Sequence, residues 1–149
     1  MRQSTVTVQW TGNLQFVGTD SGKHSVVISS HDEKNHTGVK PSEMLLLALG
    51  ACSAYDVVTI LQKKQLDLVG LMVAVTGEQE TDPPWTFRRI HLDYALRGRQ
   101  LAEAGVQQAI ELSLDKYCSV AATVSGRADI THSFKLEEDG SNETTGGGQ

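Results

Sequence analysis

The segment from Met44 to Leu61 constrains the fold of this 149-residue chain more than any other part of the sequence. It is apolar and long enough to cross a lipid bilayer. Ser53, Asp56 and Thr59 interrupt it, however, and alanines and a glycine fill its middle. We therefore expect a central helix, buried on most sides of a soluble protein, rather than a membrane span.

Charge and cysteine content narrow the class of protein. The net charge of -5 and the pI near 5.5 argue against a nucleic-acid partner, because phosphate binding needs clustered cations. The N-terminus lacks the pattern of a signal peptide, which predicts a cytoplasmic protein. Cys52 and Cys118 are the two cysteines. They form no CxxC motif, which indicates neither a thioredoxin motif nor a zinc ribbon, and we expect free thiols. We also expect no cofactor.

Hydrophobic periodicity predicts an α+β fold with the element order βββαββαβ. We expect antiparallel strands with two main helices, in a single domain over residues 1–138 that is followed by a disordered tail over 139–149. Gly98 is expected to separate the fifth strand from the second helix. The predicted strands cover residues 5–10, 14–19, 25–30, 68–80, 86–97 and 127–137, and the predicted helices cover 41–64 and 101–117.

The apolar character of the first helix also predicts its partner. Neither helix is amphipathic enough to face water along its whole length, and one small sheet cannot cover the segment from Met44 to Leu61. We therefore expect an intertwined homodimer that buries this helix.

Several motifs occur in an order that resembles the OsmC/Ohr family. Pro41 is followed by an acid, a run of leucines and an alanine-rich stretch that ends at Cys52, eleven positions after the proline. A strand pair around Pro83-Pro84-Trp85 and a cysteine after the second helix, Cys118, also match. The resemblance extends over nearly the whole chain, from Thr5 to about Leu136.

The resemblance implies the OsmC-like fold and a thiol peroxidase that reduces organic hydroperoxides. Cys52 would attack the peroxide and become a sulfenic acid, and Cys118 would condense with it to form a disulfide. A thiol reductant would then restore both thiols. The residues alone leave an alternative open, because Cys52 lies in the middle of a helix and could be a packing cysteine.

The sequence departs from the family pattern at two places. The peroxidases of the family carry an acid directly after the proline, where this chain has Ser42, and they carry an arginine in the hairpin region, where residues 11–40 have none. Glu43 lies one position later, which rotates it by about 100° around the helix. Glu43 and Arg88 are therefore candidate site residues. Glu43 could instead be a helix-start carboxylate, and Arg88 a charge at the surface.

Other positive groups could also activate Cys52. Lys40 and the histidines of the 24–36 region are further candidates for a cation near the thiol. His31 and His36 lie in one polar loop, which is typical of solvated side chains, so we expect no metal site there.

Asp56 follows Cys52 by one helical turn and lies on the same face. An unpaired carboxylate there would raise the pKa of the thiol, although Asp56 could equally be a buried hydrogen-bonding residue. Two functions remain: a hydroperoxide reductase, or a module on the same fold that binds a small apolar ligand or senses oxidation.

Overall fold

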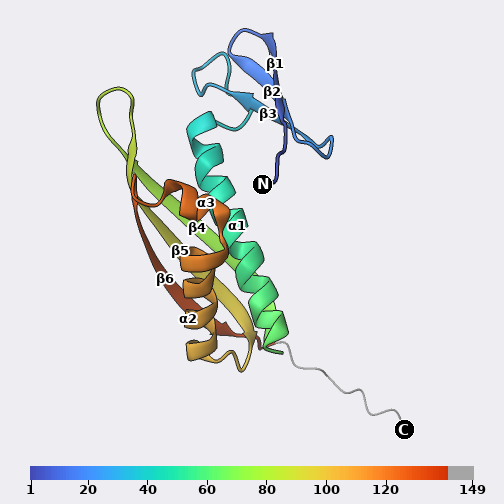
Figure 1. Ribbon diagram of the computed structural model, residues 1–149, viewed down its shortest axis with the longest axis vertical. Helices are drawn as coiled ribbons and strands as arrows, with labels where there is room; N and C mark the ends of the chain where they lie inside the picture. The colour runs from blue at the N-terminus through green and yellow to red at the C-terminus, as the bar shows by residue number, and fades with distance from the viewer. Residues whose placement is uncertain (141–149) are drawn as a thin grey trace. The chain divides into compact units, whose positions relative to one another are not determined.

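The computed structural model describes residues 1–140 and contains two compact units, Met1–Leu47 and Ala48–Gln149 (Figure 1). The α+β class and the order βββαββαβ are confirmed, with additional short helical segments after the second main helix. The elements are β1 (Thr7–Gly12), β2 (Gln15–Thr19), β3 (Ser25–Ser29), α1 (Pro41–Lys63), β4 (Asp67–Gln79), β5 (Phe87–Arg99), α2 (Glu103–Leu112), the π-helical turn η1 (Ser113–Tyr117), α3 (Ser119–Val124) and β6 (Asp129–Glu138).

The first unit is built on the antiparallel sheet β1-β2-β3. Asn13, with φ of 49°, lies in the turn between β1 and β2, where a left-handed residue allows a tight reversal. Val8 and Trp10 alternate on β1, Val6 directly precedes the strand, and each of the three is more than 60% exposed. This unit therefore presents an uncovered row of apolar side chains.

The second unit contains the sheet β4-β5-β6, with β5 in the centre. The predicted inner face of β5 is buried, as Ile90, Leu92, Tyr94 and Leu96 are at most 1% exposed. One pairing differs from the expected antiparallel arrangement, because β6 runs parallel to β5. The long connection through α2, η1 and α3 returns the chain to the same end of the sheet, which a parallel pairing requires.

The part of α1 in the second unit packs along the sheet, and α2 lies beside it (Figure 1). Its buried residues recur at helical spacing: Leu49, Gly50, Ser53, Val57 and Leu61. A Cβ atom on Gly50 would lie 2.8 Å from Val75, so the glycine permits close contact between helix and strand.

The opposite side of α1 is open in the single chain, which corrects the expectation of burial on most sides. Tyr55 is 74% exposed and Leu47 is 60% exposed. Only 28% of the most apolar 18-residue window of α1 is buried, and by length and composition the helix could cross a membrane. Ser53 and Asp56 make specific polar contacts within the second unit, which favours a protein surface over lipid as the cover.

The segment predicted as one helix over 101–117 is divided in the structure. α2 ends at Leu112, η1 follows, and α3 was not predicted. The N–H group of Cys118 donates to the carbonyl of Ser113 (2.8 Å), and Cys118 itself is extended with φ −74° and ψ 106°. Six residues without clear apolar periodicity give too weak a sequence signal for α3.

The prediction for Gly98 was wrong, because this residue lies within β5, which continues to Arg99. A Cβ atom on Gly98 would lie 2.2 Å from the carbonyl oxygen of Asp67, so the position requires glycine for close backbone contact rather than for a break. The backbone N–H of Asp139 donates to the carbonyl of Gly98 (2.7 Å), and its side chain pairs with Arg97. The rest of the predicted tail, 141–149, lies outside the described residues.

We predict that Gly98→Ala lowers the free energy of unfolding by several kcal/mol, because the new methyl group clashes with backbone. Gly70→Ala in the neighbouring strand is the matched control. Its Cβ would lie 3.4 Å or more from its nearest neighbour, the Arg97 side chain, and we expect a change below about 1 kcal/mol. Urea denaturation at one protein concentration measures both. Equal midpoints for the two variants would refute this account of Gly98.

We also predict that the protein is a homodimer in solution that covers the exposed face of α1. Sedimentation equilibrium at micromolar concentration should give twice the chain mass. Tyr55→Glu should weaken the association, because a charge in an apolar interface has to be desolvated. Glu137→Gln on an exposed strand position serves as the control. A wild-type monomer at this concentration would contradict the prediction.

Candidate active site

The fold brings together the two cysteines, which are far apart in the sequence. Cys52 lies in the middle of α1, and Cys118 lies between η1 and α3. Their sulfur atoms and a carboxylate oxygen of Asp56 all lie within 4.8 Å of one another. Both cysteines are free thiols. This arrangement is what a pair of thiols needs if they are to form a disulfide.

The turn after α2 holds Cys118 in place. Five residues in π-helical conformation precede it, and the N–H group of Ala121 donates to its sulfur at 3.3 Å. Cys118 is only 2% exposed, whereas Cys52 is partly exposed. An incoming reagent therefore reaches Cys52 more easily than Cys118.

The environment of Cys52 favours its thiolate. Burial is the largest influence and raises the pKa of this thiol. Hydrogen bonds from the Cys118 thiol, the Val120 N–H group and Ser119 act in the opposite direction and together lower the pKa below its ordinary value. The negative charge of Asp56 raises it again to a smaller extent. Donors rather than a cation therefore stabilise the Cys52 thiolate.

The environment of Cys118 favours its protonated form. Burial raises the pKa of this thiol to about 11, and its hydrogen bond to Cys52 contributes in the same direction. The two thiols thus have opposite characters: the pKa of Cys52 is lowered, and that of Cys118 is raised. This asymmetry separates a nucleophile from a thiol that reacts second.

A line of buried polar side chains leads to the site from the sheet. The hydroxyls of Tyr94 and Ser53 lie 2.5 Å apart, Ser53 Oγ lies 2.9 Å from Ser113 Oγ, and Ser113 Oγ lies 2.9 Å from Asp56 Oδ2. Burial raises the pKa of Tyr94 to about 12, so its hydroxyl remains a donor. Among residues 1–140, no buried side-chain polar atom lacks a partner.

Sequence reasoning identified Cys52, Cys118 and Asp56 but missed Ser53, Ser113 and Tyr94. A signal existed for each, because each stands at a position whose neighbours in the helical or strand pattern are apolar. A polar residue at a core position has to find a hydrogen-bond partner. Pairing such positions across elements would have required the fold.

The other predicted site residues make local contacts elsewhere. Arg88 forms an ion pair with Glu80 (2.7 Å), and its side chain is 53% exposed. Glu43 lies in the first turn of α1 and, with His31 and His36, borders an open concavity of about 610 Å³ within the first unit. None of the five strongest influences on the pKa of Cys52 comes from a cation. Roles for Glu43, Arg88 and Lys40 stay predictions.

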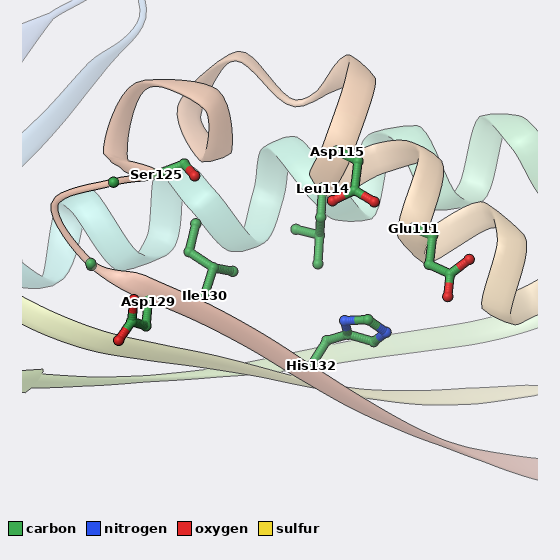
Figure 2. Close-up of a pocket in the computed structure, with 9 residues that line it drawn as sticks. Glu111, Leu114, Asp115, Ser125, Asp129, Ile130 and His132 are labelled. Atoms are coloured by element: carbon green, nitrogen blue, oxygen red, sulfur yellow. The ribbon is translucent and has the colours of Figure 1, made fainter.

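A second concave region lies between the end of α2 and the start of β6 (Figure 2). Its volume is about 320 Å³, and Glu111, Asp115, Asp129 and His132 are among its lining residues. Figure 2 shows the acidic side chains of Glu111 and Asp115 on the helical segment and His132 on the strand below them. Neither cysteine borders this region.

The donors of the site include the types that bind thiophilic cations. Two cysteine sulfurs and one carboxylate oxygen within 4.8 Å could contribute three ligands to an ion such as Zn²⁺. The absence of a metal and of a cofactor stays a prediction from the sequence. The closeness of the two sulfur atoms, within 4.8 Å, also suits direct sulfur chemistry.

Residues 31–133 match the family described as OsmC-like protein. The chain belongs to the OsmC-like family. It is 38% identical to the protein YhfA of Escherichia coli K12 over 129 residues, which cover 87% of this chain and 95% of YhfA. The family predicted from the order of the motifs is therefore confirmed.

Solved structures of other proteins share the OsmC-like fold. A hypothetical protein from Aquifex aeolicus superposes with a TM-score of 0.78 at 28% identity and covers 93% of this chain and 100% of that one. The organic hydroperoxide resistance protein OhrB of Bacillus subtilis has a TM-score of 0.61 at 14% identity, over 90% of this chain and 98% of OhrB. The second likeness establishes the fold alone.

We predict that iodoacetamide at pH 7 modifies Cys52 well before Cys118. The midpoint of Cys52 alkylation should lie below about 8.5, the value for a free cysteine, because its thiolate accepts hydrogen bonds. Cys118 in a Cys52→Ser variant should react only at much higher pH, because burial opposes its ionisation. Peptide mass spectrometry over a pH series measures both. Comparable reactivity of the two thiols at pH 7 would contradict the asymmetry.

Proposed function

We propose that this OsmC-like protein reduces organic hydroperoxides through Cys52 and Cys118 and draws electrons from a thiol reductant. The observation that carries the proposal is the contact between a thiol whose pKa is lowered and a buried thiol whose pKa is raised. A packing cysteine would need neither a hydrogen-bonded thiol partner nor a lowered pKa. The protein would act as a cytoplasmic homodimer in the response to oxidative stress, with neither nucleic acid nor membrane as a partner.

The reaction would run in three balanced steps. The Cys52 thiolate attacks one peroxide oxygen; a sulfur–oxygen bond forms, the oxygen–oxygen bond breaks, and the alkoxide takes a proton to leave as alcohol. Cys118 then attacks the sulfenic acid of Cys52, which gives the disulfide and water. Two electrons from a dithiol, or from two monothiols, reduce the disulfide and regenerate both cysteines.

An organic peroxide suits the site better than hydrogen peroxide. Cys52 lies on a helix whose accessible residues are largely apolar, so an alkyl group gains free energy by leaving water there. The structurally similar OhrB is named for organic hydroperoxide resistance. Both observations support the proposed substrate class.

A second candidate function is redox sensing without fast turnover. It is favoured by Asp56, whose negative charge opposes formation of the Cys52 thiolate, and by the lack of a cation among the main influences on that thiol. Such a protein would consume one equivalent of peroxide and keep the disulfide. Turnover in the presence of a reductant separates the two functions.

We predict catalytic consumption of cumene hydroperoxide by the purified protein with dithiothreitol, at a higher kcat/KM than with hydrogen peroxide. Cys52→Ser should abolish consumption, and Cys118→Ser should allow about one equivalent before Cys52 is overoxidised. Glutathione, as a monothiol, should support slower turnover than the dithiol. Single-equivalent consumption by the wild type would favour the sensor, and consumption equal to that of Cys52→Ser would contradict both functions.

A further inference from the structure

A line of buried hydroxyl groups ends at the Asp56 carboxylate. Each hydroxyl carries one hydrogen, and a carboxylate only accepts. The Ser113 hydroxyl is placed to donate to Asp56 Oδ2 and to Ser53 Oγ, each at 2.9 Å. The hydroxyls of Ser53 and Tyr94 lie 2.5 Å apart, and either can be the donor. Ser113 is therefore the hydroxyl that holds the Asp56 carboxylate, and Ser53 and Tyr94 hold Ser113 from the side of the sheet.

This line fixes the Asp56 carboxylate beside both sulfurs. Ser53 and Ser113 are fully buried, so their hydroxyls cannot exchange partners with water. The carboxylate contributes an oxygen within 4.8 Å of each cysteine sulfur. The negative charge of this carboxylate opposes the thiolate of Cys52, so a role for Asp56 has to be sought at the other thiol.

The second thiol presents the chemical problem that this carboxylate could solve. Cys118 has to lose its proton as it attacks oxidised Cys52, yet its buried position favours the protonated form. Asp56 is the carboxylate among residues 1–140 that is grouped with the two sulfurs. The titratable groups around it are Cys52 on its own helix, Cys118 after η1 and Tyr94 on β5.

We propose that Asp56 accepts the thiol proton of Cys118 as Cys118 attacks oxidised Cys52, and that Ser113, Ser53 and Tyr94 position the carboxylate for this step. In hydroperoxide reduction, which rests on the proposed function, the sulfur–sulfur bond forms while the sulfur–oxygen bond of the sulfenic acid breaks. The proton taken by Asp56 passes to the departing hydroxide, which leaves as water. No further reactant is needed.

The same proton transfer takes place when Cys52 carries a mixed disulfide. The aromatic disulfide known as Ellman's reagent reacts with the Cys52 thiolate and releases one coloured thiolate. Cys118 then attacks the mixed disulfide, releases the second coloured thiolate and gives up its proton. The second phase is intramolecular, so its rate does not depend on reagent concentration, and it reports the Cys118 step without any peroxide.

We predict opposite effects of Asp56→Asn on the two phases. The amide oxygen still accepts from Ser113, so the local structure is kept, but the base and its charge are lost. The first phase should be as fast as in the wild type or faster, since the negative charge beside Cys52 is removed. The second phase should slow at pH 7 by on the order of 100-fold, the lower range for a general base. It should recover as the pH rises and Cys118 ionises unaided.

Two further variants distinguish the loss of a base from general damage to the fold. Asp115→Asn removes an exposed carboxylate from the η1 turn, which also contains Ser113, and should leave both phases unchanged. Ser113→Ala removes the donor that holds Asp56 and should slow only the second phase, by less than Asp56→Asn. Stopped-flow absorbance from pH 6 to pH 10 measures all of these rates.

The outcomes distinguish this inference from the proposed function. An unchanged second phase in Asp56→Asn, or equal slowing of both phases in Ser113→Ala, would overturn the role of Asp56. If the second phase slows as predicted while the wild type fails to consume hydroperoxide, the role of Asp56 stands and the peroxidase proposal fails.

Discussion

The hydrogen bond between Ser53 on α1 and Tyr94 on β5, together with the burial of Leu49 and Val57, holds one face of the cysteine helix against the sheet. With Ser53 facing the strand between the buried residues Leu49 and Val57, helical geometry turns the neighbouring Cys52 and Asp56 towards the side of the helix. That side meets η1 and Cys118. A helix rotated by one residue would bury Cys52 against the sheet and move Asp56 away from Ser113. The site therefore depends on a polar contact inside an otherwise apolar interface.

The two cysteines differ because their surroundings differ, although they lie in contact. Cys52 receives donors from three groups, two of which belong to the first turn of α3. Cys118 is enclosed by the segment that supplies those donors, so burial dominates its own ionisation. One local structure, the π-helical turn followed by α3, thus creates both the nucleophile and its protonated partner. A thiol pair with equal pKa values would lack this division of roles.

Much of the fold followed from periodicity, and the first helix began at Pro41 as its sequence predicted. Periodicity could not give the parallel pairing of β6, since strand direction depends on a connection whose path is tertiary. It also missed α3, which is too short for a pattern, and it placed a break at Gly98, where close backbone contact with Asp67 requires glycine. The two thiols were identified from the sequence because cysteine is a chemically reactive residue that occurs only twice in this chain. Ser53, Ser113 and Tyr94 were missed because their role arises only from their mutual distances.

The chain lacks the arginine of the family pattern, and hydrogen-bond donors around Cys52 lower the pKa of that thiol instead. A cation stabilises a thiolate over a long range, and its effect does not depend on the protonation of the second cysteine. The donors around Cys52 act only over hydrogen-bond distances. One of those donors is the Cys118 thiol itself. A protonated Cys118 therefore supports the thiolate form of Cys52. In this chain hydrogen-bond donors favour the thiolate of Cys52, and burial keeps Cys118 protonated.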